Sequence, residues 1–307
     1  MTSIVLNYSR QMFFKLKAYK RLLAQSPYYK LMRLDKPVGI YLVLFPCLWT
    51  ILFAATELWQ VFVYVPLFAL GAIIMRGAGC TINDIIDQKA DQSVERTKHR
   101  PLANGDIDIK SASKFLILLL VLAFILLLAI PDSAKTVAVL SLIPIACYPY
   151  MKYVTNFSQV FLGLVFNLGV IIAWLTVSDT FSFIPIIIYL AAAFWTIGYD
   201  TIYAHQDRKD DINSGLKSLA IKLDKRTSAV VWHLYLTAMG LLCLVGLNLH
   251  MNFIFFLGLA VATYHMYWQI STLDIEDPKN CHERFISNTE VGAILFIAIL
   301  LGRLRIF

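Results

Sequence analysis

Long apolar segments recur along the whole chain and set the strongest limit on its fold. Nine of them lie near residues 38–57, 60–83, 114–131, 134–152, 158–178, 182–205, 228–248, 251–271 and 286–303. Most have about 20 residues, enough for an α-helix to cross a hydrocarbon core of roughly 30 Å. The runs are continuous rather than alternating, which excludes a transmembrane β-barrel. We therefore predict an all-α polytopic membrane protein, a bundle of about nine transmembrane helices.

Composition agrees with this fold class. Charged residues make up 15% of the chain, whereas a soluble domain has about a quarter. No linker or low-complexity segment interrupts the 307 residues, so we expect a single domain over 1–307. The five cysteines form no CxxC pair, and we interpret them as buried, small apolar residues rather than a disulfide framework or metal site.

The N-terminal segment precedes the first apolar run. No cleavable signal peptide is expected, because that run begins only near Val38. Residues 1–35 are basic and contain no acid before Asp35. This pattern predicts an interfacial amphipathic helix; a mitochondrial transit peptide is the alternative.

Basic residues fix the orientation of the bundle. If the nine spans alternate in direction, one side carries 23 of the 27 lysines and arginines. By the positive-inside rule this side is cytoplasmic, and we predict a bacterial inner membrane, with the mitochondrial inner membrane less favoured. Anionic lipid heads account for the net charge of +7. The charge therefore requires no nucleic acid partner, and the sequence indicates no protein partner.

Two acidic clusters lie at the basic side, each closing an even-numbered span. A carboxylate near the bilayer centre costs roughly 2.5–3.5 kcal/mol, so something must compensate these clusters. In the first, Asn83, Asp87 and Asp91 are spaced i, i+4 and i+8, which places all three on one helix face. Oxygen ligands on one stripe are suited to a divalent cation.

The second cluster has equivalent spacing. Asp207 and Asp211 are i, i+4, and Asp200 lies seven residues before Asp207. In a bundle the two stripes can face each other across a cavity. Mg²⁺ favours a few carboxylates with substrate phosphate oxygens and water. The predicted metal ligands are Asn83, Asp87, Asp91, Asp207 and Asp211.

Basic residues follow each cluster. Arg96 and Arg100 come after the first, and Arg208 and Lys217 accompany the second. Arginine offers a forked contact to phosphate and lysine a point charge. Where basic loops occur without an acidic cluster, the positive-inside rule is enough to explain them. Where they adjoin acidic stripes, they indicate a metal–diphosphate site.

These residues resemble the signatures of the UbiA-type intramembrane prenyltransferases. The first signature is similar to Asn83-Asp84-x-x-Asp87-x-x-x-Asp91 with Arg96-Thr97-x-x-Arg100-Pro101-Leu102. The second is similar to Tyr199-Asp200-Thr201-x-Tyr203 with Asp207-Arg208-x-Asp210-Asp211 and Gly215-x-Lys217-Ser218. Tyr148-Pro149-Tyr150-Met151-Lys152 resembles a further YxxxK element, and Arg33-Leu34-Asp35-Lys36-Pro37 resembles the opening of the branch that prenylates 4-hydroxybenzoate.

The resemblance implies an enzyme that transfers a polyprenyl group from polyprenyl diphosphate to the ring of 4-hydroxybenzoate, in ubiquinone biosynthesis. Mg²⁺ is the implied cofactor, and ionisation of the diphosphate is followed by electrophilic aromatic substitution. The implied catalytic residues are Asp84, Asp87, Asp91, Asp200, Asp207 and Asp211. The implied substrate-binding residues are Arg33, Arg76, Arg96, Arg100, Tyr148, Lys152, Tyr203 and Lys217.

Several assignments have alternatives. Asp84 is a proton acceptor or a solvated neighbour, and Arg76, an intramembrane arginine, is a functional residue or the structural ion-pair partner of Asp200. The family commonly has arginine after the YxxxK lysine, where this chain has Tyr153, so another cation must hold the acceptor carboxylate.

A prenyltransferase acting on a naphthoate, a haem or a lipid is a second hypothesis. A cation-coupled transporter is a third, disfavoured because the acids lie at helix ends rather than at the midplane.

Overall fold

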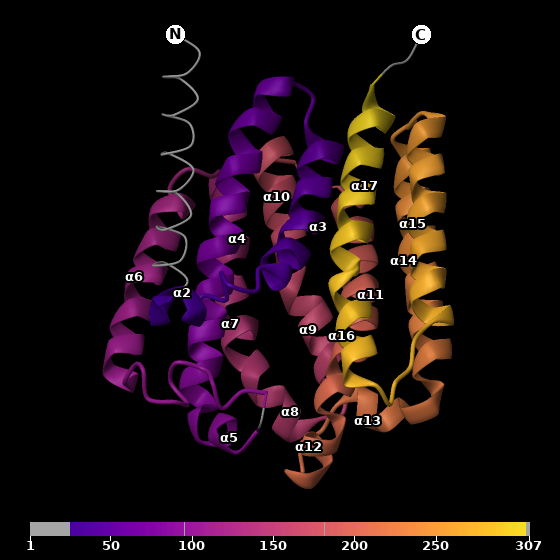
Figure 1. The fold of residues 1–307 in the computed structure, drawn as a ribbon. Coiled ribbons are helices and arrows are strands. Elements are labelled where there is room, and N and C mark those ends of the chain that lie inside the picture. Colours follow the sequence, from indigo (N-terminus) through magenta and orange to yellow (C-terminus); the bar gives the residue numbers. More distant parts are fainter. Residues whose placement is uncertain (1–24, 95, 181, 305–307) are drawn as a thin grey trace, which may run out of the picture. The chain divides into compact units, whose positions relative to one another are not determined.

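Helices make up all the regular secondary structure in the residues that the computed structural model describes, 25–94, 96–180 and 182–304 (Figure 1). Within these residues, eight helical stretches are long and apolar enough to cross a membrane. They are Leu58–Ile86, Ile109–Leu127, Asp132–Val154, Ser158–Ser178, Ile184–Asn213, Leu219–Asn248, Phe253–Ser271 and Pro278–Arg303. A further apolar helix, α3 (Val38–Ala54), has 17 residues. The predicted all-α membrane fold is confirmed.

Three of these stretches are single helices, and five combine shorter ones. The single helices are α4 (Leu58–Ile86), α6 (Ile109–Leu127) and α15 (Phe253–Ser271). The others comprise α7 (Asp132–Cys147), η1 (Tyr148–Tyr150) and α8 (Met151–Val154); α9 (Ser158–Phe166) and α10 (Leu168–Ser178); α11 (Ile184–Ala204), η2 (His205–Asp207) and α12 (Arg208–Asn213); α13 (Leu219–Leu223), η3 (Asp224–Arg226) and α14 (Thr227–Asn248); and α16 (Pro278–Ile286) and α17 (Asn288–Arg303). Two short helices, α2 (Pro27–Leu31) and α5 (Gln88–Ser93), flank α3 and α4 in the chain.

Helix starts differ most from the predicted boundaries where a polar residue caps the helix. α6 begins at Ile109 rather than near 114, and Asp108 Oδ1 accepts a hydrogen bond from the Ser111 amide at 2.9 Å. α16 begins at Pro278 because Asp277 accepts from the Lys279 amide at 2.9 Å. Both aspartates act as N-caps. Apolar patterning locates the part of a helix that contacts lipid, whereas capping locates its first turn.

The chain forms two compact units. The first comprises the residues up to Gly39 together with Ile73–Ala123. Its core contains Leu31, Leu102, Ile107 and Ala112, so that α2 packs against the loop after α5 and the start of α6. The predicted interfacial helix over 1–35 lies largely outside the described residues, and α2 is its described end. The single-domain assignment stays a prediction.

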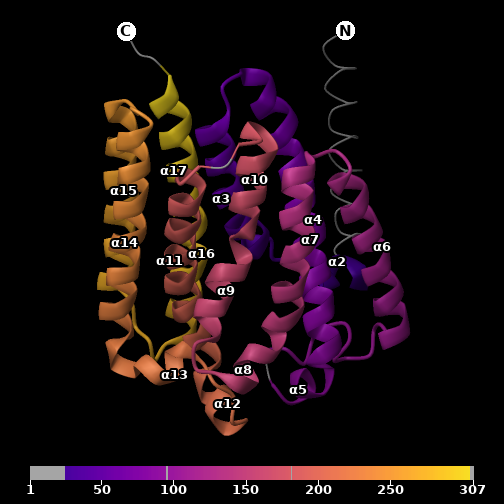
Figure 2. The ribbon, with the colours of Figure 1, turned by 180° about the vertical axis from the view of Figure 1, so that it is seen from behind.

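The second unit comprises Ile40–Ala72 and the chain from Phe124 onward. Figures 1 and 2 show α14 and α15 side by side within it. Helices approach closely through small residues: a Cβ at Gly198 of α11 would lie 2.5 Å from the Tyr235 ring of α14, and one at Gly163 of α9 would lie 2.6 Å from Ile197. Lipid tails provide no hydrophobic drive between helices, so such close contacts hold the unit together.

Polar side chains also connect helices inside this unit. Trp195 Nε1 donates to Asn288 Oδ1 at 2.9 Å, which links α11 to α17. At the opposite end of α17, Arg303 Nη1 donates to the carbonyl oxygens of Leu52 and Phe53 in the last turn of α3. The last carbonyls of a helix have no partner in the helix itself, so α17 caps α3.

The cysteines are free thiols, as expected from their spacing. Cys47, Cys80 and Cys281 are buried, in agreement with their interpretation as small apolar residues. Cys147, at the end of α7, is exposed and departs from it.

Candidate active site

The first acidic motif lies where α4 passes into α5. Asp87 leaves the helical conformation, with φ −91° and ψ 5°. The hydrogen-bond register nevertheless continues, because the Asp87 amide donates to Asn83 O and the Asp91 amide to Asp87 O, both at 2.8 Å. Asn83, Asp87 and Asp91 thus remain one helical turn apart across the bend.

The second motif repeats this backbone arrangement in the other unit. α11 and η2 end at Asp207, whose φ of −104° and ψ of 3° match those of Asp87, and the six-residue α12 follows. Neither Asp87 nor Asp207 caps the helix that follows it through its side chain. An aspartate at an N-cap position usually does so. Neither carboxylate is therefore engaged in capping the helix that follows it.

Asp91 is buried beside a cation. Arg100 Nη1 donates to Asp91 Oδ2 at 2.7 Å, and Thr97 Oγ1 donates to the Asp91 carbonyl at 3.1 Å. Burial raises the pKa of the Asp91 carboxyl, and the Arg100 guanidinium opposes part of that rise. Asp87 is buried as well.

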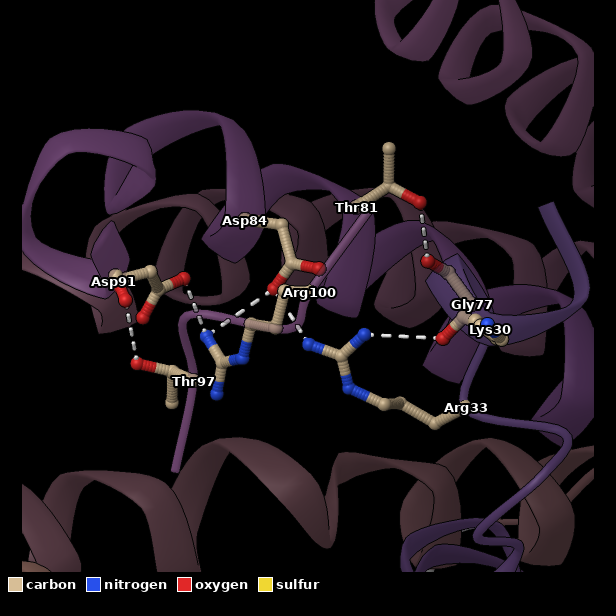
Figure 3. A network of polar contacts seen from close by, with 8 residues as sticks. All are labelled: Lys30, Arg33, Gly77, Thr81, Asp84, Asp91, Thr97 and Arg100. Atoms are coloured by element: carbon tan, nitrogen blue, oxygen red, sulfur yellow. Dashed lines mark hydrogen bonds and ion pairs between the residues drawn. The ribbon is translucent and has the colours of Figure 1, made fainter. Parts of the chain in front are cut away.

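Asp84 joins two arginines (Figure 3). Its Oδ1 accepts from Arg33 Nη2 at 2.6 Å and from Arg100 Nη1 at 3.3 Å. The Asp84 side chain is 1% exposed, so it is not the solvated neighbour that the sequence left open. The structure brings together Arg33, Asp84, Asp91 and Arg100 from three separate stretches of the first unit.

Arg33 adopts an unusual backbone conformation, with φ of 58°. The left-handed region is uncommon for residues other than glycine. The side chain is held at both nitrogens of its fork, because Nη1 donates to Lys30 O at 3.0 Å while Nη2 reaches Asp84. Sequence patterning gave no indication of this conformation.

The side chain of Asn83 has an oxygen that could bind a metal ion. Its Oδ1 is buried and has no hydrogen-bond partner within the described chain. Such an atom costs about 1–3 kcal/mol unless a ligand satisfies it. An amide oxygen is a hard donor suited to Mg²⁺. Among the described residues, no three His, Cys, Asp or Glu side chains form a metal-binding group by themselves, so the remaining oxygens would come from substrate and water.

Arg76 lies in α4, seven residues before Asn83, and packs against Gly39 at the start of α3. A Cβ on Gly39 would lie 2.8 Å from Arg76 Nε and 2.9 Å from Nη2. The guanidinium therefore occupies space that only glycine leaves open. Gly39 was not among the predicted site residues, and only the contact with Arg76 identifies it.

The second unit brings the two predicted lysines together. The Lys217 amide donates to Lys152 O at 2.8 Å, and Lys217 Nζ donates to Val154 O at 3.1 Å. Lys152 Nζ lies 5.2 Å from the Tyr153 ring. The segment after α12 is thus attached to α8, next to the YxxxK element.

The other predicted residues of this unit lie in aromatic pairs or are partly buried. Tyr203 stacks on Phe285 with ring centroids 4.4 Å apart, and the Tyr148 ring lies 6.0 Å from that of Phe166. Asp200, Asp207 and Asp211 are partly buried, and Asp210 is exposed. In the first unit Arg96 is exposed.

Arg208 follows Asp207 in sequence and contacts other acids. It donates to Asp224 Oδ1 at 2.5 Å and to Glu276 Oε1 at 3.0 Å. These contacts connect the start of α12 to η3 and to the loop before α16 in the second unit. Arg208 therefore has a structural role that its place in the motif did not reveal.

Known proteins resemble this chain along most of its length. Residues 43–300 match the UbiA prenyltransferase family. The chain belongs to that family. It is 39% identical over 278 residues to the mitochondrial 4-hydroxybenzoate polyprenyltransferase of Arabidopsis thaliana, covering 90% of this chain and 68% of the relative. The human enzyme of the same name is 40% identical over 283 residues, covering 91% of this chain and 76% of the relative.

Solved structures show the same fold. A UbiA homolog from Aeropyrum pernix K1 superposes with a TM-score of 0.72 at 21% identity, covering 87% of this chain and 98% of the homolog. A UbiA homolog from Archaeoglobus fulgidus, bound to GPP and Mg²⁺, has a TM-score of 0.71 at 21% identity, covering 90% of this chain and 99% of the homolog. Family membership also excludes the transporter hypothesis.

The predicted location requires correction. The prediction of a bacterial inner membrane is wrong, because the curated relatives are mitochondrial enzymes of eukaryotes, including Arabidopsis thaliana, Homo sapiens and Drosophila melanogaster. Lysine and arginine counts indicate which side of the membrane the basic ends of the spans face. They carry no information about which of two energy-transducing membranes holds the bundle.

Proposed function

We propose that this protein transfers a polyprenyl group from polyprenyl diphosphate to the ring of 4-hydroxybenzoate, a step of ubiquinone biosynthesis. The identity of about 40% to enzymes of that name, over nine tenths of the chain, carries the proposal. The relatives are named as mitochondrial enzymes, and eight described helical stretches of this chain are long and apolar enough to cross a membrane. These two observations support a proposed location in a mitochondrial membrane.

The metal is proposed to be Mg²⁺. Asn83, Asp87 and Asp91 of the first motif and Asp207 and Asp211 of the second would supply ligands together with diphosphate oxygens and water, because no three described carboxylates form a metal-binding group by themselves. The unsatisfied Asn83 oxygen and the equivalent bends at Asp87 and Asp207 support this assignment. When bound, Mg²⁺ supplies positive charge to the departing diphosphate. Asp200 lies two turns before Asp207 and is assigned to support the second motif.

Cationic side chains bind the diphosphate oxygens. Arg33 and Arg100 present guanidinium forks, while Lys152 and Lys217 add point charges from adjoining segments. Arg96 is exposed beside the first motif and is assigned to the entering diphosphate. These groups stabilise charge that grows as the allylic C–O bond breaks.

Aromatic side chains are assigned to the carbocation and acceptor. Tyr203 and Tyr148 lie in aromatic pairs, and π-faces stabilise a developing cation. Arg76, inside α4, is assigned to an anionic group of the substrates. The phenol-activated ring attacks the allylic carbon that the diphosphate leaves, and the ring proton then passes to that diphosphate or to water, which restores aromaticity.

The test is product formation by the purified full chain. Radiolabelled geranyl diphosphate and 4-hydroxybenzoate are incubated with Mg²⁺, and the product is identified by mass spectrometry. A prenylated 4-hydroxybenzoate that disappears on chelation of the metal supports the proposal. The same assay is run with a naphthoate, a haem and a lipid as acceptors. If one of these is prenylated in preference to 4-hydroxybenzoate, the assigned acceptor is contradicted, while prenyl transfer as the reaction is still supported.

A further inference from the structure

Asp84 is the most buried charged residue of the first motif, and within the described residues its side-chain hydrogen bonds come from two arginines. One oxygen, Oδ1, accepts from Arg33 Nη2 at 2.6 Å and Arg100 Nη1 at 3.3 Å (Figure 3). It follows Asn83 by one residue, so it lies about 100° around the helix from the Asn83–Asp87–Asp91 stripe. Asp84 thus contacts Arg33, which follows α2, and Arg100 of the loop after α5. Arg100 Nη1 also reaches Asp91 of the stripe, at 2.7 Å.

The two arginines keep donors for another ligand. Within the described chain, Arg100 contacts carboxylates through Nη1, which leaves Nε and Nη2 of its fork. Arg33 uses Nη1 and Nη2 and leaves Nε. Their side chains are 23% and 21% exposed, whereas Asp84 is 1% exposed. The Asp84 carboxylate is enclosed, whereas the two guanidinium groups that it binds are partly accessible to a ligand.

The Arg33 and Arg100 guanidiniums carry like charges and both bind Asp84 Oδ1, so their repulsion must be offset. Arg33 and Arg100 share a single oxygen atom, and two unit charges about 4 Å apart repel by about 4 kcal/mol at an effective dielectric constant of 20. Asp84 and Asp91 neutralise the pair, so the four-residue cluster has no net charge before substrate enters. Asp84 also contributes to holding Arg33 in its left-handed conformation.

We propose that Asp84 is a positioning residue that holds the Arg33 and Arg100 guanidiniums in place for the diphosphate of the prenyl donor. It is neither a metal ligand nor a proton acceptor in this assignment. The inference rests on the proposed function, since it takes diphosphate as the ligand of the two arginines. It replaces the catalytic role that the sequence suggested for Asp84.

The test compares Asp84→Asn in two backgrounds. Binding of radiolabelled geranyl diphosphate to the full chain is measured with Mg²⁺ and without acceptor, so that no turnover occurs. In the wild-type background Asp84→Asn is expected to raise Kd at least tenfold. In the Arg33→Ala/Arg100→Ala background it is expected to change Kd less than twofold, because no guanidinium remains to position. An equal loss in both backgrounds overturns the proposal.

Kinetics add a second readout. Asp84→Asn is expected to raise KM for geranyl diphosphate while kcat at saturation stays within about threefold. A large fall in kcat at unchanged KM would identify a proton acceptor and overturn the proposal. Asp106→Asn makes the same chemical change at an exposed position of the same unit and is expected to leave both constants unchanged.

Removing one partner of a buried ion pair can unfold a protein, so two further variants keep Asp84 paired. Arg33→Lys and Arg100→Lys retain the charge and lose the fork, and each is expected to weaken geranyl diphosphate binding about tenfold. Wild-type Kd in both would show that fork orientation is irrelevant and would overturn the proposal. If the wild-type protein fails to bind geranyl diphosphate, the proposed function itself is contradicted. This outcome distinguishes failure of the proposed function from failure of the positioning role of Asp84.

Discussion

Replacing Gly39 by alanine should disturb Arg76 without unfolding the protein. The new Cβ would lie 2.8 Å from Arg76 Nε, 2.9 Å from Nη2 and 3.2 Å from Cζ. Ordinary contacts begin near 3.4 Å, so the guanidinium must move by roughly 0.6 Å or more. It lies at the far end of a flexible side chain, and alanine is favoured over glycine in a helix by roughly 0.5–1 kcal/mol. The melting temperature should therefore stay unchanged or rise.

Activity should respond more strongly. A misplacement of about 1 Å in a positioning group can reduce a rate about 100-fold, so we expect kcat/KM to fall about 10- to 100-fold, or roughly 1.4–2.7 kcal/mol. The assay is prenyl transfer to 4-hydroxybenzoate, with KM determined separately for each substrate. Gly71→Ala is the matched control, because a Cβ there meets nothing within 4 Å.

A double variant links the effect to Arg76. In an Arg76→Ala background, Gly39→Ala should cause no further loss, since no guanidinium remains to displace. Wild-type kcat/KM in Gly39→Ala would refute the reasoning. So would an undiminished second loss in the double variant.

Three further predictions concern the acidic motifs and the YxxxK element. Asp87→Ala or Asp207→Ala should abolish turnover while membrane insertion, checked by fractionation, persists; wild-type rates in either would contradict a metal role. Tyr153→Arg should be tolerated or activating in the same assay, and a folded but inactive variant would count against the motif alignment there. Because burial raises the pKa of Asp91, protons should compete with Mg²⁺ at a higher pH than for an ordinary aspartate. Arg100 lowers the pKa of Asp91, so Arg100→Gln should raise further the pH below which Mg²⁺-dependent activity is lost. An unchanged pH for this loss of activity would refute the assignment of Asp91.

Periodic features of the molecule were predictable from the sequence. Apolar runs located the spanning helices, since lipid imposes a length that composition alone reveals. They did not locate every helix start, because polar caps such as Asp108 and Asp277 begin helices several residues earlier. Spacing by four residues placed Asn83, Asp87 and Asp91 in one helical register, and the structure keeps that register across the bend.

Contacts between distant stretches were not predictable. Asp84 was interpreted through its neighbours in the motif, yet its environment is set by Arg33 and Arg100, which reach it from other segments. The left-handed backbone of Arg33 has no signature in residue type, because arginine rarely adopts it. Gly39 is one glycine among 14, and only the tertiary fold shows which of them borders a guanidinium.

The capping of α3 by Arg303 has a practical consequence for handling this enzyme. A truncation or cleavage that removes the chain from Arg303 onward would deprive the Leu52 and Phe53 carbonyls of their donor, and unsatisfied backbone groups cost several kcal/mol each in an apolar medium. Affinity tags at this terminus should therefore be added after the native residues, with no residues deleted.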